Sequence, residues 1–441
     1  MSGHRHLSRE LLLAARRGQI SERRMVEILV ERFAGECPRC REEAEAAQAE
    51  EVPEEAYRPP VRRALDLEEA LRRYDEDARS AAELLALLEG LSPEQRLLRI
   101  RNSPERFGNV ALGEELGEKA RACLPHDPRG SLAWARALEA VAGAYPTPYP
   151  PHRALALAFQ GNAYRAAGDF QRGRALLLRA QELVVQEQVA DVDVRAELHS
   201  FLGSLFTDLR RLEEAAAELR AAAELFELLA DDVRLARILM KLGLLHALMG
   251  DLQAALQADH RAVHLLSPER DTQLYLSARL NLALHLADAG EVQQARETLD
   301  LDFTLFYDDA DDHTRVRFDC LQARLAAESG EHDRAERRYR RVLGEFARQG
   351  HGFNAAHVCL ELAALYADQG RLEEVAEMAS QAVEIFRAHE THRDALGALL
   401  LLRDAALERT LTARRIRCAA RDLWQLSPAA PGRRSGRHEL R

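Results

Sequence analysis

The sequence has few aromatic residues, almost no lysine and no long apolar run. Aromatic residues make up 5% of its 441 residues, whereas Ala, Leu, Glu and Arg are abundant, and these residues favour helices over sheets. Lysine occurs only at Lys119 and Lys241, and we attribute the preference for arginine to a GC-rich genome. Because no run of about 18 apolar residues occurs, the sequence predicts no membrane-spanning helix.

Cysteine is also scarce, and negative charge outweighs positive charge. Six cysteines in a chain of this length do not form a disulfide framework and favour a reducing cytoplasm. Residues 1–9 are polar and Leu11–Ala15 is too short for the apolar core of a signal peptide, so we expect no secretion signal. The formal net charge of −11 argues against a general nucleic-acid binder, which needs a basic face.

Motifs of known catalytic chemistry are absent as well. The sequence has no GxxxxGK[ST] phosphate loop, no HExxH metal motif and no GxSxG nucleophile motif. The most acidic run, residues 308–313, lacks the glycine and the final glutamate of a calcium loop. We interpret it as a solvated loop between repeats, and we expect the protein not to be an enzyme.

One pattern recurs six times with a small residue at its third position. These small residues are Gly161, Gly203, Gly243, Ala283, Ala323 and Ala363. The first interval is 42 residues and the next four are 40, so the register is constant. A small side chain in the middle of a helix lets a second helix approach closely. The pattern therefore predicts helical hairpins that pack through these positions.

A turn residue follows seven positions after each small residue. It is glycine in five repeats and arginine in the second, at Gly168, Arg210, Gly250, Gly290, Gly330 and Gly370. Glycine at this place adopts the left-handed conformation that ends a helix. Apolar residues between these landmarks recur at three- and four-residue spacing, as amphipathic helices require.

This pattern resembles the tetratricopeptide repeat family. Gly161, Tyr164, Gly173 and Ala180 have the spacing of the family's small and aromatic positions, although the period exceeds the usual 34 residues. A HEAT-like or generic α-solenoid is the alternative. The resemblance implies an all-α, right-handed solenoid of antiparallel helix pairs.

The predicted organisation has six parts. They are a three-helix module at 1–50, a linker at 51–65, a helical connector with a degenerate repeat at 66–150, six repeats at 151–394, a capping helix pair at 395–426 and a disordered tail at 427–441. The Pro-rich stretch before residue 151 separates the connector from the repeats, and a capping pair protects the end of a solenoid.

The N-terminal module resembles the zinc-binding anti-sigma fold. Its candidate ligands are His6, Cys37 and Cys40, with Phe33 at the position of the family's second histidine and His4 as a substitute ligand. Structural zinc takes four ligands, so three alternatives stay open: a Zn²⁺ site, a metal-free junction, or a redox CxxC. The resemblance implies a second partner of sigma-factor type.

The functional prediction concerns the repeats. In the tetratricopeptide family the first helix of each pair lines a concave groove that binds the partner. Carrying the family's groove positions over gives Asn162, Arg165, Ser204, Thr207, Lys241, Asn281, Arg317, Arg324, His357 and Glu361. Amides and cations there suit the backbone and acidic groups of an extended peptide. We expect a cytoplasmic bacterial adaptor or regulator that binds a protein or peptide. The alternative is a sensor in which a ligand on the solenoid controls the N-terminal module.

Overall fold

Every regular element that the structure describes is an α-helix. The computed structural model describes residues 8–17, 19–20, 43, 67–124, 127–146, 148–349 and 352–388. Before the regular array lie α1 (Arg9–Arg16), α4 (Leu67–Glu89), α5 (Pro93–Asn102), α6 (Pro104–Phe107), α7 (Val110–Cys123) and α8 (Pro128–Ala142). The all-α prediction is confirmed for these residues, and none of the described helices has the length and apolar character to cross a bilayer.

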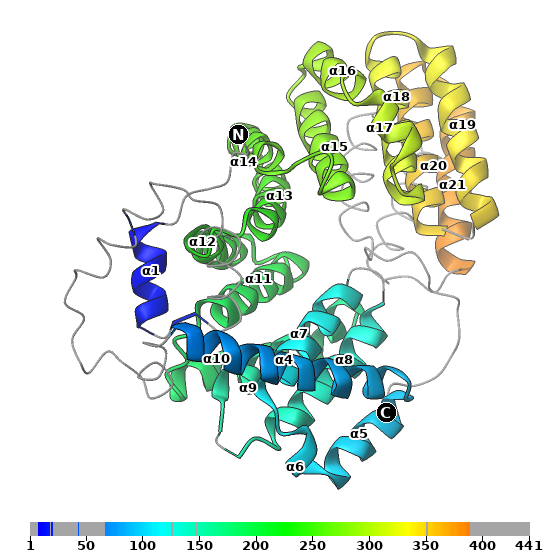
Figure 1. The fold of residues 1–441 in the computed structure, drawn as a ribbon. Coiled ribbons are helices and arrows are strands. Elements are labelled where there is room, and N and C mark those ends of the chain that lie inside the picture. Colours follow the sequence, from blue (N-terminus) through cyan, green and yellow to red (C-terminus); the bar gives the residue numbers. More distant parts are fainter. Residues whose placement is uncertain are drawn as a thin grey trace. The chain divides into compact units, whose positions relative to one another are not determined.

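Six hairpins follow, one for each predicted repeat (Figure 1). They are α9 (Pro150–Ala166) with α10 (Phe170–Gln186), α11 (Val192–Asp208) with α12 (Leu212–Leu228), α13 (Asp232–Leu248) with α14 (Leu252–Leu265), α15 (Thr272–Asp288) with α16 (Val292–Asp300) and α17 (Phe303–Asp308), α18 (Asp312–Glu328) with α19 (His332–Gln349), and α20 (Gly352–Asp368) with α21 (Leu372–Ala388). Each first helix has 17 residues, so the constant period of the sequence corresponds to a constant structural unit.

The turns form at the predicted positions. The five turn glycines have φ between 72° and 85°, the left-handed region that glycine enters without steric cost. Arg210 replaces glycine in the second hairpin and has φ 59°. The chain therefore keeps the same turn even where the side chain disfavours it, because the packing of α11 on α12 determines the connection.

First and second helices differ in burial. In α9, 12 of 17 residues are buried, since this helix packs against α7, α8, α10 and α11. In α10 only Gly173, Leu177 and Ala180 are buried. A second helix therefore shows most of its surface to solvent, whereas a first helix exposes only a narrow polar strip between its neighbours.

Helix starts before the repeats follow local sequence signals. Ser92 caps α5 with a complete capping box, in which Gln95 binds back to the Ser92 backbone. Asn109 caps α7 through a hydrogen bond from Leu112. Helices α7 and α8 pack against each other and α8 packs against α9, so the predicted degenerate repeat forms a helix pair.

The chain divides into two compact units, residues 1–245 and 246–441. One continuous apolar cluster in the first unit extends from Ala81 to Leu205. The second unit has one cluster around α15 and α18 and another around α19, α20 and α21. The predicted capping pair at 395–426 and the tail at 427–441 lie outside the described residues.

Candidate partner-binding face

The residues predicted to bind a partner all lie on first helices. Within each unit, we call the side of the first helices that carries these residues the first-helix face. Asn162 and Arg165 lie on α9, Ser204 and Thr207 on α11, Lys241 on α13, Asn281 on α15, Arg317 and Arg324 on α18, and His357 and Glu361 on α20. We describe the face separately in each unit.

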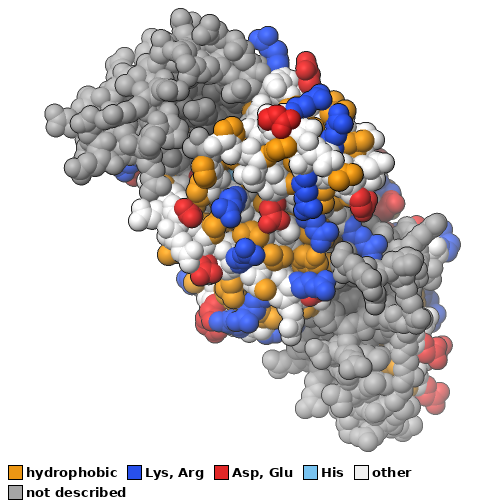
Figure 2. Space-filling view, turned by 90° about the horizontal axis from the view of Figure 1, so that it is seen from below, with side chains coloured by type: hydrophobic (Ala, Val, Ile, Leu, Met, Phe, Trp, Pro, Cys, Tyr) orange, Lys and Arg blue, Asp and Glu red, His pale blue; other side chains and the backbone are white. Residues whose placement is uncertain are grey.

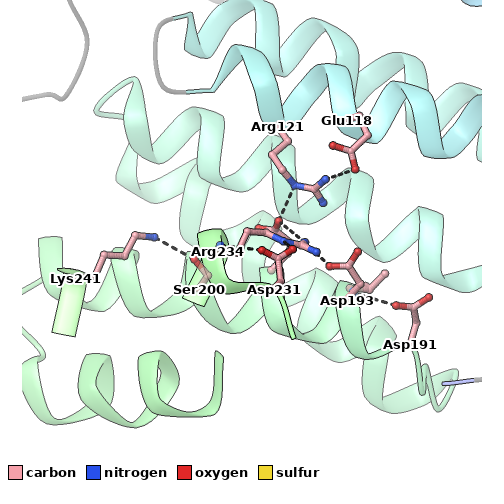
Figure 3. Close-up of polar contacts among 10 residues, drawn as sticks. Glu118, Arg121, Asp191, Asp193, Ser200, Asp231, Arg234 and Lys241 are labelled. Carbon is pink, nitrogen blue, oxygen red and sulfur yellow. Dashed lines mark hydrogen bonds and ion pairs between the residues drawn. The ribbon is translucent and has the colours of Figure 1, made fainter. Parts of the chain in front are cut away.

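In the first unit, Lys241 lies against α11 (Figure 3). Its Nζ atom is 3.0 Å from the hydroxyl oxygens of both Ser200 and Ser204. The Ser204 hydroxyl donates its own hydrogen to the Ser200 carbonyl at 2.9 Å, so its oxygen accepts from the ammonium group. Within the described residues these two hydroxyls are the hydrogen-bond partners of Lys241, and no carboxylate bonds it.

The surroundings of Lys241 disfavour its charge. Burial is the main cause that lowers its pKa to about 8, and repulsion from Arg165 is the next. An ammonium group has three N–H donors, of which the two serines take two. Attraction to Glu197 and Asp208 offsets only part of this penalty. A carboxylate on a partner would supply the third acceptor together with a directly bonded negative charge.

The other polar residues of this unit are already bonded. Arg165 donates from Nε to the Asn162 side-chain oxygen at 2.7 Å and from a terminal nitrogen to Asp208 at 2.6 Å. Thr207 donates to the Gly203 carbonyl within its own helix. Arg165 thereby connects α9 to α11, and the partner-binding role predicted for these residues stays a prediction.

In the second unit the predicted cations also have partners. Arg317 donates to the Asn281 side-chain oxygen at 2.8 Å. Arg324 is 2.8 Å from both Asp288 and Glu328. These contacts join α18 to α15 across adjacent hairpins.

The last predicted pair lies on α20. His357 Nε2 is 3.7 Å from the Glu361 carboxylate, and that carboxylate accepts a hydrogen bond from Tyr339 of α19 at 3.2 Å. Among the predicted cations, Arg165 and Arg324 therefore pair with carboxylates, whereas the hydrogen bonds of Lys241 go to two hydroxyl oxygens.

Sequence reasoning missed the acceptors on this face, although a signal for them exists. Five residues after the small residue of the repeat, four hairpins carry an acid, at Asp208, Asp288, Glu328 and Asp368. Two of these acids bind the arginines just described, and Glu328 binds Arg324 within α18. Their recurrence could have identified them.

A second group of charges lies at the start of α11 and α13 (Figure 3). Glu197, which is 5% exposed, lies 2.7 Å from Arg121 of α7 and 3.3 Å from Arg234 of α13. Arg234 also binds Asp193, and Asp231 at 2.7 Å. This network joins three first helices of the unit through side chains that are largely removed from water.

Asp191 at the edge of this network makes the stability of the fold depend on pH. Its side chain caps α11 by accepting from the Val194 N–H at 3.1 Å. Burial, followed by repulsion from Asp193, raises the pKa of Asp191 from 3.8 to about 7. The folded chain therefore binds more protons at this site than the unfolded chain between about pH 4 and 7, and its stability falls as pH rises through that window.

We predict that Asp191→Asn is more stable than wild type above pH 7, by about 1–3 kcal/mol. Asparagine keeps the capping oxygen and removes the buried charge. The difference should vanish below about pH 4, where the carboxyl is neutral in both states. Thermal unfolding and hydrogen exchange of α11 from pH 4 to 8 measure this, and a difference independent of pH would contradict the role given to Asp191.

The predicted metal ligands His4, His6, Cys37 and Cys40 lie outside the described residues. Among the residues that the structure describes, no group of three or more His, Cys, Asp or Glu side chains is arranged to hold a metal ion. On the face shown in Figure 2, basic, acidic and apolar side chains are interspersed, and the described part of this surface shows no continuous patch of one charge.

Comparison with known proteins identifies the fold. No protein-family model matches the sequence, and no curated protein does. Among solved structures, the apo form of RapI matches with a TM-score of 0.53 at 13% identity, covering 79% of this chain and 93% of RapI. A Rap protein complexed with competence and sporulation factor matches with a TM-score of 0.52 at 13% identity, covering 70% of this chain and 88% of that protein.

A third similar structure is aspartyl phosphate phosphatase F from Bacillus subtilis. It matches with a TM-score of 0.50 at 13% identity, covering 87% of this chain and 96% of the phosphatase. These likenesses establish that the chain is a tetratricopeptide-like solenoid of stacked antiparallel helix pairs, resembling Rap proteins in fold.

Proposed function

We propose that this chain is a non-catalytic adaptor whose first-helix face binds a protein or peptide segment through an acidic group, with Lys241 as the anchor. The observation that carries the proposal is the position of the Lys241 ammonium group, which contacts two hydroxyl oxygens and no carboxylate among the described residues. The other predicted cations, Arg165, Arg317 and Arg324, already have acceptors across the repeats.

The energetics support a ligand that carries a carboxylate. A partly buried ammonium without a counter-ion has lost hydration and gained little Coulomb energy in return. A charge-assisted hydrogen bond to a carboxylate restores that loss, and it is stronger than a bond between neutral groups. The complex of a Rap protein with competence and sporulation factor supports the idea that this fold accommodates a partner.

One contact favours a regulatory version of this proposal. The Val192 N–H donates to the Gln19 carbonyl at 2.7 Å, so the segment after α1 is attached to the first residue of α11. The same helix carries Ser200 and Ser204, which hold Lys241. A ligand that changes the position of α11 would thereby act on the N-terminal segment, as the sensor hypothesis requires.

The test exploits the presence of only two lysines. Lys241→Gln should weaken partner binding at least tenfold, because a hydrogen bond to a charged group contributes about 1.5–3 kcal/mol. Lys119→Gln is the matched control, since it removes the same charge from a surface lysine paired with Glu89 at 2.5 Å. Partners are captured from the source cells with wild type and both variants, identified by mass spectrometry, and then titrated as purified segments.

Binding should also depend on pH in a defined direction. The ammonium form of Lys241 dominates below pH 8, so affinity for an acidic segment should fall as pH rises through and above about 8. Because a bound carboxylate raises the pKa of Lys241, the fall in affinity should occur at a higher pH in the complex. Equal affinity of both lysine variants, or a flat pH profile that matches Lys241→Gln, would exclude Lys241 as the anchor.

A further inference from the structure

The second helix of the fourth hairpin is interrupted. It consists of α16 and α17, separated by Leu301 and Asp302, whereas the other second helices are continuous over 14 to 18 residues. The Asp302 carboxylate points inward and lies 2.5 Å from Arg279 Nε. At the break, therefore, Asp302 contacts α15 while the neighbouring Leu301 is exposed.

Large apolar side chains are exposed at the break. Leu301 is 78% exposed, Phe303 43% and Tyr307 46%. In the 40-residue register the other hairpins carry no large apolar residue at the position of Leu301; they have Arg179, Ala221, Arg261, Arg341 and Gln381. The repeat architecture therefore does not require a leucine here.

The aromatic residues at the break are held in place. The rings of Phe303 and Tyr307 have centroids 5.0 Å apart, and Phe303 lies 5.9 Å from the buried ring of Phe318. Phe318 in turn stacks on buried Phe306 at 4.4 Å. A rigid exposed aromatic pair binds a partner with little loss of side-chain entropy.

Acidic residues surround this apolar surface. Residues 300–312 contain six aspartates and no lysine or arginine. Asp302 and Asp311 are used internally, the latter as the cap of α18. Asp311 is nevertheless exposed, as are Asp300, Asp308, Asp309 and Asp312.

Two arginines border the surface. Arg315 lies 3.6 Å from Asp312, and Arg341 contacts Tyr307 and Asp319. Since the exposed aspartates outnumber these two cations, the rim keeps an excess of negative charge.

We propose that Leu301, Phe303 and Tyr307, which we call the α17 patch, dock a basic amphipathic helix of a partner protein. Exposed aromatic and leucine side chains supply the apolar anchors of an interface. The aspartate rim would attract lysine or arginine side chains beside the apolar stripe of such a helix and repel acidic competitors. This patch lies on a second helix, so it is a different surface from the first-helix face and serves a different ligand.

The aspartate rim also disfavours three other ligands of the α17 patch: a second copy of the chain, an anionic membrane and a nucleic acid. A second copy of the chain would bring two aspartate rims together, and like charges across an interface are costly. An anionic membrane or a nucleic acid would meet the same repulsion. A basic helix satisfies both the apolar centre and the acidic rim.

The probe is an 18-residue synthetic peptide of leucine and lysine with one apolar face, labelled for fluorescence anisotropy and titrated with the full-length protein. The double variant Leu301→Arg with Tyr307→Glu should bind it at least tenfold more weakly. Arginine occurs at the position of Leu301 in the third hairpin (Arg261), and glutamate occurs at the position of Tyr307 in the second hairpin (Glu227). The double variant therefore uses residues that the repeat tolerates, and it leaves the net charge unchanged. Bulk electrostatics therefore cannot explain a loss of binding.

Two further variants serve as comparisons. Val185→Glu changes another exposed apolar residue, 71% exposed, at the position in the first hairpin equivalent to Tyr307, and it should bind normally. Asp308→Asn with Asp309→Asn should weaken binding and reduce its dependence on salt, and it tests the rim if the double variant fails to fold.

Several outcomes would overturn the proposal. They are failure of wild type to bind the basic peptide, equal binding by the double variant, and equal binding of a peptide with glutamate in place of lysine. A wild-type dimer in light scattering that becomes monomeric in the double variant would assign the α17 patch to a second copy instead.

Discussion

Gly161→Ala is expected to separate α9 from α10 and to lower the stability of the first hairpin by about 2–3 kcal/mol. A Cβ atom at this position would lie 2.8 Å from Leu177 Cγ and 3.0 Å from both the Gly173 carbonyl oxygen and the Leu177 nitrogen. Two of these three atoms belong to the backbone of α10 and cannot move without moving the helix. Gly173 makes the reciprocal approach, since its Cβ would lie 2.9 Å from the Gly161 carbonyl oxygen.

Two other glycines are suitable controls. A Cβ at Gly203 would meet mainly the Leu219 side chain, which can change rotamer, so Gly203→Ala should cost less. Gly344 in α19 has no atom within 4 Å of the added Cβ, and Gly344→Ala should stabilise its helix by about 0.5–1 kcal/mol. Thermal unfolding of each variant, together with hydrogen exchange of the altered hairpin, ranks the three variants by stability. A Gly161→Ala protein as stable as wild type would show that the two helices are not in close contact.

Arg234→Met is expected to destabilise the first unit by about 3–5 kcal/mol. Methionine keeps much of the apolar stem and removes the charged guanidinium group, whose Cζ atom lies 4.8 Å from the centre of the Phe226 ring. The change leaves Asp193, Asp231 and Glu197 with their shared cation gone. Buried or partly buried carboxylates without a counter-ion are costly, because neither water nor a partner compensates their charge.

A double-mutant cycle separates this effect from lost packing. Glu197→Gln alone removes the negative charge that Arg121 and Arg234 share. Combined with Arg234→Met it should cost less than the sum of the two changes, because the paired charges disappear together. Arg211→Met is the surface control, since its partner Glu214 is half exposed and such pairs contribute little. Additive losses in the cycle would mean that Arg234 and Glu197 do not stabilise each other.

The sequence by itself determined the repeat architecture. The small residues at constant intervals and the glycine seven positions later specify which helices pair and where each turn lies, because both features act through local backbone sterics. Arg210 shows the limit of this local argument, since its turn forms with φ 59° although the side chain disfavours it.

The sequence also placed the ten predicted residues on first helices, but it did not show which of them already have partners. Arg324 and Lys241 are both cations at positions taken from the family's groove, yet Arg324 binds Asp288 and Glu328 while Lys241 binds hydroxyls. That difference depends on which side chain of the adjacent hairpin lies opposite, about 40 residues away in sequence.

The charge network of the first unit and the surroundings of the helix break were decided by the tertiary structure, because they also depend on contacts between residues far apart in sequence. Arg121 and Glu197 are 76 residues apart, and no periodic pattern relates them. At the interruption of the fourth hairpin, Asp302 contacts Arg279 of α15, a pairing that neither segment reveals alone. Periodicity therefore determined the helices and their order, whereas the charges that remain available for a partner depend on contacts between adjacent hairpins.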